Sequence, residues 1–163
     1  MFEYQDIGIK FMQDRPRTLN ADEPGLGKTR QALLAANGRT LVVAPAVIRD
    51  MHIWEDELIK WEAPIDMTVI SYHELCARVN GKMQSYLNPK WDHQWNTVIF
   101  DEAHNLKNRK AHWTKAAHSF LTKTEKLFLL TGTPIPNWSF ELFPLLQLLR
   151  PDDARRGKPL GGY

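Results

Sequence analysis

DEPGLGKT, from Asp22 to Thr29, is the part of this 163-residue sequence that says most about its architecture. Glycines at positions 25 and 27 allow tight turns and bring backbone N–H groups close to phosphate oxygens. Lys28 is a point charge that can reach the β- and γ-phosphates of a nucleotide, and the hydroxyl of Thr29 can ligate Mg²⁺. The octapeptide therefore predicts a phosphate-binding loop, with an ordinary glycine turn that opens a helix as the alternative.

The residues that follow this loop are typical of a helix. The run Thr29–Asn37 (TRQALLAAN) would place a helix N-terminus, which favours anions, beside the phosphates, and Gly38 suits its end. One position departs from the common pattern G-x-x-x-x-G-K-[ST], because Asp22 stands where its first glycine is expected.

An acidic pair supplies the second half of the predicted site. Asn96–Phe100 is a short apolar, β-branched run, typical of a buried strand, and it ends directly on Asp101 and Glu102. Ligands of α/β proteins bind at the carboxyl ends of parallel strands, so this pair should lie beside the loop. Asp101 would hold Mg²⁺ through water, and Glu102 would orient or deprotonate an attacking water. The alternative is a helix N-cap, since acidic residues favour a first helical turn.

Composition narrows the class of protein. Hydrophobic residues make up 43% and charged residues 25% of the chain, which is usual for a globular protein, and its length suits one domain. A net charge of +2 does not indicate a nucleic-acid binder, so any such surface would be local, as at residues 107–110 (KNRK), where a solvated face is the alternative. Cys76 is the only cysteine, which excludes an intrachain disulfide and suggests a small core residue.

Strands alternate with helices along the chain. We expect strands at Thr18–Ala21, Thr40–Ala44, Met67–Ser71, Asn96–Phe100 and Lys126–Leu130. We expect helices at Tyr4–Met12, Thr29–Asn37, Val47–Trp61, His73–Val79, Arg109–Phe120 and Ser139–Leu149. The polar stretch 81–94 is expected to be an exposed loop, and residues 153–163 a flexible tail. The alternation predicts an α/β fold of the P-loop class, a three-layer sandwich with a mainly parallel sheet covered on both faces.

The six tryptophans fall into three groups. Trp54 and Trp61 are seven residues apart, on one face of a helix, and are predicted to lie in the core. Trp91 and Trp95, in the loop before the acidic strand, are interpreted as a hydrophobic lid, with base stacking as the alternative. Packing is also the expected role of Trp113 and Trp138.

Seven motifs occur in a characteristic order. They are YQ at 4–5, DEPGLGKT at 22–29, LVVAP at 41–45, ISYHEL at 70–75, DEAHNLKN at 101–108, LLTGTPIPN at 129–137 and ELFPLLQLLRPD at 141–152. In this order they resemble the first motor lobe of the Swi/Snf-like DNA translocases of helicase superfamily two. The resemblance extends over residues 4–152, and that family also has an acid at the position of Asp22.

The resemblance implies a RecA-like lobe at residues 1–152 that uses ATP and Mg²⁺. Gln5 would read the adenine edge, and Tyr4 would pack near the base. The nucleotide-binding residues that it implies are Tyr4, Gln5, Asp22, Pro24, Gly25, Leu26, Gly27, Lys28 and Thr29. The catalytic residues are Lys28, Asp101 and Glu102, with Thr29 and Asp101 at the metal.

The resemblance also implies coupling to double-stranded DNA. His104 would link the ATP site to the DNA track, and the coupling motif would be Thr131, Gly132 and Thr133. Pro45 and the turn at Ser71 and Tyr72 would contact the DNA backbone, so binding should be salt-sensitive and blind to sequence; ordinary strand-end loops are the alternative.

The family has two lobes, with ATP bound between them, and the second lobe supplies an arginine finger. No arginine of this chain matches that finger, so a second RecA-like lobe is expected from another polypeptide or from sequence absent here. Without it turnover should be slow, because such an arginine accelerates phosphoryl transfer roughly 10³- to 10⁵-fold. The alternative is a non-catalytic nucleotide- or DNA-binding accessory protein.

The expected location follows from the partner. The N-terminus has no apolar stretch of signal length, and no run approaches a membrane span. We therefore expect a protein that is not secreted and has no membrane partner, in the cytoplasm or wherever the DNA is, nucleoid or nucleus.

Overall fold

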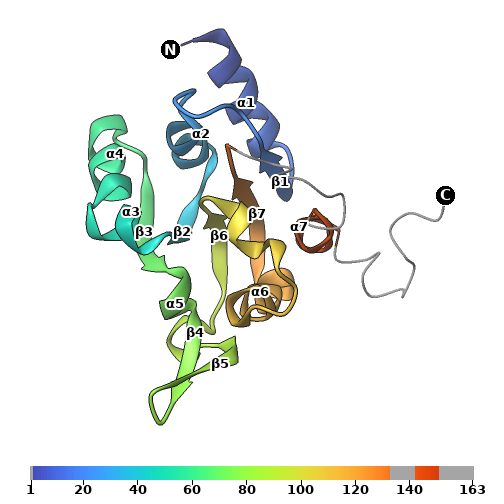
Figure 1. Cartoon of the computed structure of the whole chain (residues 1–163). Coiled ribbons are helices and arrows are strands. Elements are labelled where there is room, and N and C mark those ends of the chain that lie inside the picture. The colour runs from blue at the N-terminus through green and yellow to red at the C-terminus, as the bar shows by residue number, and fades with distance from the viewer. Residues whose placement is uncertain (1, 133–141, 151–163) are drawn as a thin grey trace, which may run out of the picture.

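A five-stranded parallel sheet forms the centre of the molecule (Figure 1). The computed structural model describes residues 2–132 and 142–150. In spatial order the strands are β1 (Arg17–Asn20), β7 (Thr124–Leu130), β6 (Trp95–Phe100), β2 (Gly38–Ala44) and β3 (Ile65–Ser71). The mainly parallel sheet predicted from the sequence is confirmed, as are the five strand positions.

Apolar runs on the inner strands explain why the sheet is covered on both faces. Along β2, Leu41 and Val43 belong to one hydrophobic core and Val42 and Ala44 to the other, because successive side chains of a strand point to opposite faces. All four side chains are fully buried. A strand buried on both faces reads as a continuous apolar run, as LVVA does here.

Helices cover the two faces, which confirms the three-layer architecture. Ile9, Leu33 and Trp54 lie in the core of one face, and they come from α1 (Glu3–Gln13), α2 (Lys28–Ala35) and α4 (Ile53–Trp61). The other core draws on α5 (Tyr72–Leu75), α6 (His112–Ala117) and α7 (Phe143–Leu149), and on the 3₁₀ helices η2 (Ala103–Lys107) and η3 (His118–Thr122). In Figure 1, α1 and α2 lie at the top, α3 and α4 at the left, and α6 and α7 at the right.

The single helix predicted at Val47–Trp61 is wrong. Two helices occupy this stretch, α3 (Ala46–Asp50) and α4 (Ile53–Trp61). Between them, His52 adopts a left-handed backbone with φ of 53°. A left-handed residue redirects the chain, so α4 can pack Trp54 under the sheet independently of α3.

The helix predicted at His73–Val79 and the loop predicted at 81–94 are also wrong. The chain instead forms an antiparallel hairpin of β4 (Cys76–Val79) and β5 (Lys82–Leu87), followed by the short 3₁₀ helix η1 (Pro89–Trp91). Asn80 and Gly81 make the two-residue turn, with φ of 49° and 76°. Positive φ at both central positions is the turn geometry that fits the twist of a hairpin.

The hairpin projects from the lower end of the molecule in Figure 1, and its base is part of the core. Cys76, as predicted, is a buried core residue. Trp91 and Trp95 are buried beside it, so the lid and base-stacking interpretations are both wrong. Trp113 packs partly buried against the same core, as predicted, and Trp138 lies outside the described residues.

The C-terminal part of the chain agrees in outline with the prediction. The helix expected at Arg109–Phe120 is shorter and continues as η3. The helix expected at Ser139–Leu149 is described as Phe143–Leu149, and the predicted tail lies outside the described residues. Among the helices of residues 2–132 and 142–150, none has the length and apolar character needed to cross a bilayer.

Candidate functional site

One cleft of about 440 Å³ brings together the phosphate loop and the acidic pair of Asp101 and Glu102. Its walls come from the phosphate loop, α1, α2, α3, α4 and the carboxyl end of β6. The lining residues are Gln5, Pro24, Gly25, Gly27, Lys28, Thr29, Arg30, Ile48, Ile53, Glu57, Lys60, Trp61, Asp101 and Glu102. The loop and the acidic pair, far apart in sequence, therefore face the same space.

The glycines of the loop are required by its geometry. Gly25 and Gly27 have φ of 84° and 79°, values that other residues adopt only with strain. Gly27 is also the N-cap residue of α2, and a Cβ on it would lie 2.6 Å from Nε2 of Gln5. A side chain at position 27 would therefore displace the glutamine that the sequence analysis assigned to the base.

The ammonium of Lys28 is held by the loop itself. Its Nζ donates to the backbone carbonyls of Asp22 at 2.7 Å and Glu23 at 3.0 Å. Gly132 lies against the same loop, because a Cβ on it would be 3.0 Å from Cγ of Pro24 and 3.6 Å from this Nζ. The first residues of the TGT motif thus border the phosphate loop, and Thr133 lies outside the described residues.

The acid at the first position of the loop has a structural explanation. Gln31, which is fully buried, donates from Nε2 to Oδ2 of Asp22 at 3.0 Å and accepts at Oε1 from the side chain of Asn20 at 3.1 Å. Asn20 in turn accepts from the backbone N–H of Asp22. These bonds hold the beginning of the loop against β1 and α2. They also explain why β1 has a polar residue, Asn20, at its end.

Asp101 is fixed by the core beneath it. Its Oδ2 accepts a hydrogen bond of 3.0 Å from the indole Nε1 of the buried Trp54, and its backbone N–H donates to the carbonyl of Val43. Burial raises the pKa of Asp101 and the charge of Glu102 adds to this, although the hydrogen bond from Trp54 works against it. A cation bound beside Asp101 would stabilise the ionised form and so oppose the effect of burial.

The oxygen donors in the cleft fit Mg²⁺. Carboxylate and hydroxyl oxygens, here of Asp101 and Thr29, are its usual ligands, and phosphates supply others in nucleotide sites. Within the described residues, no three His, Cys, Asp or Glu side chains gather closely enough to hold a metal without such help. The arrangement therefore suits a metal bound together with a nucleotide.

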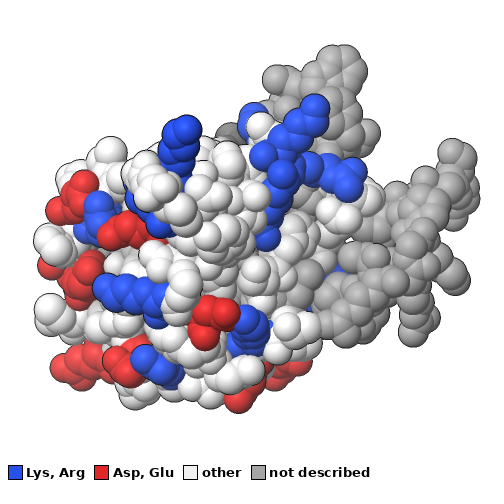
Figure 2. Space-filling model, turned by 90° about the horizontal axis from the view of Figure 1, so that it is seen from below, with Lys and Arg blue, Asp and Glu red and all other residues white. Residues whose placement is uncertain are grey.

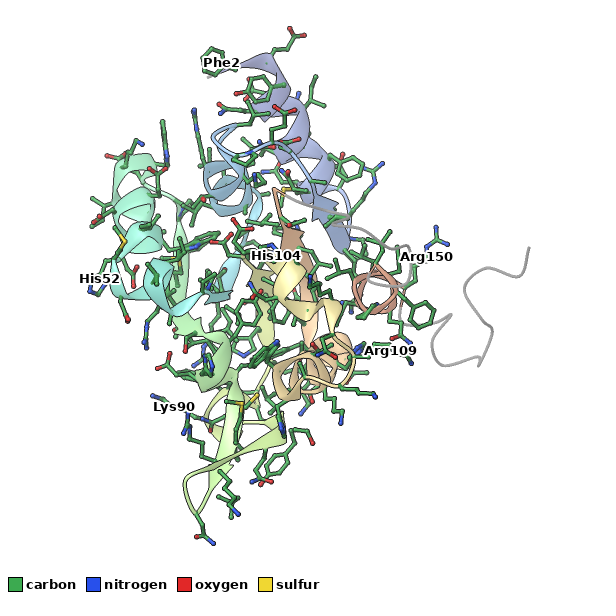
Figure 3. The ribbon with its side chains drawn as sticks, in the orientation of Figure 1. Phe2, His52, Lys90, His104, Arg109 and Arg150 are labelled. Carbon is green, nitrogen blue, oxygen red and sulfur yellow. The ribbon has the colours of Figure 1, made fainter. Side chains whose placement is uncertain are left out.

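Glu102 has an unusual backbone and a defined neighbour. Its φ of 47° is left-handed, and its backbone carbonyl accepts from the side chain of Asn105 at 2.8 Å. Nδ1 of His104 lies 3.2 Å from Oε2 of Glu102 and 3.4 Å from Oγ1 of Thr131. His104, near the middle of the molecule in Figure 3, thus joins the acidic motif to the start of the TGT motif.

The three residues predicted to contact DNA lie at strand ends. Pro45 precedes α3 as its N-cap residue. The side chain of Ser71 is buried and accepts from the backbone N–H of Glu74 at the start of α5. Tyr72 is buried as well, and its hydroxyl donates to the backbone carbonyl of Asp101 at 2.7 Å. Burial raises the pKa of Tyr72 well above its ordinary value, so this phenol stays a donor. Ser71 and Tyr72 therefore serve contacts within the protein, and DNA binding at these turns stays a prediction.

Part of the cleft was not predicted from the sequence. Trp61, predicted to lie in the core, is half-buried and lines the cleft with Arg30 and Glu57. Tyr4 does not line it and is 42% exposed beside a separate groove between α1 and β1. The available signal was the spacing of Glu57 and Trp61, four residues apart on one helical face.

Comparisons with known proteins identify relatives of this chain. A sequence model described as the SNF2-related domain matches residues 65–158. The SWI/SNF-related matrix-associated actin-dependent regulator of chromatin subfamily A-like protein 1 of Bos taurus is 32% identical over 93% of this chain. Helicase SWR1 of Debaryomyces hansenii is 38% identical over 91% of it. The chain spans 17% and 11% of the lengths of these two relatives.

Two solved structures share the fold. The SWI2/SNF2 ATPase core of Sulfolobus solfataricus, determined in complex with double-stranded DNA, superposes with a TM-score of 0.69 at 24% identity and covers 92% of this chain. The Hef helicase domain of Pyrococcus furiosus gives a TM-score of 0.55 at 15% identity over 90% of the chain. The chain corresponds to 36% and 35% of these two structures.

Proposed function

The chain belongs to the family of SNF2-related domains, and from this premise we propose that it is the ATP-binding lobe of a DNA-dependent ATPase that moves along double-stranded DNA. The observation that carries the proposal is the single cleft lined by Lys28, Thr29, Asp101 and Glu102. A lysine, a hydroxyl and two carboxylates around one cavity are the groups that hydrolysis of a nucleoside triphosphate needs.

Each of these residues has a role in the proposed reaction. Lys28 exchanges its two carbonyl acceptors for the oxygens of the β- and γ-phosphates, while Thr29 and Asp101 hold Mg²⁺. Thr29 and Asp101 would place the positive charge of the ion where negative charge develops on the phosphates. Glu102 accepts hydrogen bonds from the attacking water and orients it for in-line attack, and His104 beside it holds its carboxylate in place.

The contact between His104 and Thr131 supports a coupling role. Through it, a change at Glu102 reaches the TGT motif, which lies against the phosphate loop at Gly132. We assign the coupling of hydrolysis to movement to His104, Thr131 and Gly132, with Thr133 beyond the described part. A second RecA-like lobe completes the site and supplies the arginine finger.

Duplex DNA is the proposed partner, held by its backbone at Pro45 and at the Ser71–Tyr72 turn. Lys107, Arg109 and Lys110 are exposed immediately after the acidic motif. From the hairpin end, the upper right of the described surface carries Lys and Arg without acidic side chains, whereas the acidic side chains lie at the left and bottom among further Lys and Arg (Figure 2). Arg109 lies on the right in Figure 3, near α6 and α7. This uneven distribution favours a polyanion on the basic side, and the protein would act in the compartment that holds that DNA.

The proposal is tested by nucleotide binding and turnover of the purified chain with and without duplex DNA at low salt. We expect Mg²⁺-dependent ATP binding that Lys28→Ala abolishes, with slow turnover until a second lobe is added. ATP binding that needs neither Mg²⁺ nor Lys28 would contradict the assignment of the cleft.

Glu102→Gln distinguishes the proposal from a non-catalytic accessory protein. In the completed enzyme it should lower turnover on the order of 10²-fold, the contribution of a general base, and leave ATP affinity intact. Full turnover in this variant would remove the catalytic role. Glu125→Gln, an exposed carboxylate on β7, is the matched control.

A further inference from the structure

A row of side chains crosses from α4 over α2 to α1 along one wall of the cleft. Glu57, Trp61, Arg30 and Gln5 all line this cleft, and each contacts the next. The proposed phosphate and metal chemistry uses none of the first three. Their arrangement therefore calls for a role of its own.

The row begins with an anchored indole. Oε2 of Glu57 accepts from Nε1 of Trp61 at 2.6 Å, and its Oε1 accepts from Nζ of Lys60 at 2.8 Å. The hydrogen bond from Lys60 holds the pKa of Glu57 below its ordinary value, so the carboxylate is ionised at neutral pH. The ring of Trp61 is thus fixed at its N–H edge.

The fixed indole holds a guanidinium. Cζ of Arg30 lies 3.7 Å from the ring centroid of Trp61, within the range of a strong cation–π contact. A planar guanidinium that stacks in this way directs its N–H groups outward in its own plane rather than into the ring. One of them, Nη1, donates to Oε1 of Gln5 at 3.0 Å.

Gln5 is consequently held from both sides with opposite polarity. Its Oε1 accepts from Arg30, and its Nε2 donates to the backbone carbonyl of Leu26 at 3.2 Å. A flipped amide would set Nε2 against the guanidinium and Oε1 against the carbonyl, which are two repulsive contacts. Gln5 is buried, with 6% of its surface exposed, so water cannot offset that cost.

We propose that Arg30, clamped on Trp61, is a positioning residue that fixes the amide of Gln5 and thereby makes the cleft select adenine over guanine. Adenine presents an N6 amino donor beside the N7 acceptor, whereas guanine presents the O6 and N7 acceptors. An amide in one fixed orientation complements the adenine pair, and an amide that flips freely serves either base. The inference rests on the proposed ATP function and extends it to the choice of base.

Affinity measurements with three ligands test the inference. Mg-ATP, Mg-GTP and magnesium tripolyphosphate, which has no base, are titrated into the parent chain and its variants. The parent should prefer ATP over GTP about tenfold or more, the discrimination typical of a bidentate amide–adenine pair. Arg30→Ala and Trp61→Ala should reduce the ratio toward one by weakening ATP, with tripolyphosphate affinity unchanged. Trp61→Phe, which keeps a stacking ring but loses the bond to Glu57, should give an intermediate ratio.

Arg15→Ala is the matched control, because Arg15 also stacks on an aromatic ring, that of Phe11, at 3.9 Å, but does not line the cleft. Its ATP-to-GTP ratio should equal that of the parent. Equal losses for all three ligands in Arg30→Ala would show that Arg30 acts on phosphate and would overturn the inference, as would an unchanged ratio. Equal affinity of the parent for ATP and GTP would overturn the inference alone, whereas failure of the parent to bind any of the three would contradict the proposed function too.

Discussion

The two faces of the central sheet are joined to their helices in different ways. On the face of α1, α2 and α4, polar side chains link one element to another: Gln5 bonds to the loop before α2, Gln31 bonds to the loop and β1, and Trp54 bonds to the end of β6. On the opposite face, large rings such as Phe100 and Phe120 pack against one another, and Tyr72 of the same core is linked to the cleft by the bond from its hydroxyl to the backbone of Asp101. The polar contacts of the first face also shape the cleft, so stability and function are coupled there. On the other side, stability and function are separable at rings such as Phe120 that do not bond to the cleft.

The largest expected effect separates stability from function on the packed face. Phe120→Ala removes a fully buried ring that meets Phe100 edge-on at 6.3 Å, and it should cost about 3–5 kcal/mol of unfolding free energy. Denaturant unfolding measures this loss, and ATP titration below the melting temperature should give the affinity of the parent. Phe11→Ala, on the 46% exposed ring of α1, should change stability by less than about 0.5 kcal/mol. A loss of ATP affinity in folded Phe120→Ala would contradict the separation of stability from function on this face of the sheet.

A smaller effect should join stability and function on the cleft face. A Cβ on Gly8 would lie 1.9 Å from Oε1 of Gln31, so Gly8→Ala must displace the side chain that holds Asp22. Overpacking of this kind costs about 1–3 kcal/mol, and ATP affinity should fall with it because the phosphate loop loses its tether. Ile7→Ala, on the neighbouring exposed position, is the control for α1 itself. Destabilisation with full ATP affinity would show that the loop does not depend on Gln31.

The smallest expected effect is the pH dependence of stability and of metal binding that comes from the protonation of Asp101. Its pKa is raised in the folded protein, so the contribution of this group to stability is present below the unfolded value and is lost as pH rises through the folded value. Mg²⁺ needs the ionised form, so metal-dependent ATP binding should strengthen over the same rise in pH.

Trp54→Phe removes the hydrogen bond that lowers this pKa. The midpoint of Mg²⁺-dependent ATP binding should therefore move to higher pH, as measured by titration across a pH series. Trp113→Phe, whose indole donates to the carbonyl of Asn105, is the control, and a midpoint that stays in place in Trp54→Phe would exclude the proposed influence on Asp101.

The sequence predicted the parts of the fold that depend on local chemistry. DEPGLGKT and the acidic pair identified the loop, the buried strand before Asp101 and the cleft, because glycine conformation and buried apolar strands leave strong local patterns. The hairpin at Cys76–Leu87 was missed although its Asn80-Gly81 turn is a strong hairpin signal. Its strands alternate too weakly for the period to be recognised before the contacts with α6 are known.

Other parts depend on tertiary contacts that leave no local pattern. The break at His52 carries neither glycine nor proline, so nothing in the sequence separates α3 from α4. Trp61 was predicted to lie in the core because a helical period gives the face of a side chain but not what that face meets. Asp22 could be matched to a family but not explained until Gln31 and Asn20 were seen beside it.

The left-handed backbone of Glu102 sets a limit on how heat-resistant this lobe can become. A side chain at such a φ costs on the order of 1–3 kcal/mol, and glycine would release most of that strain. Glycine would also delete the carboxylate proposed to orient water. Selection for thermal stability therefore favours glycine at this position, and selection for turnover favours glutamate. An engineered lobe stabilised by Glu102→Gly would lose the carboxylate proposed to orient water.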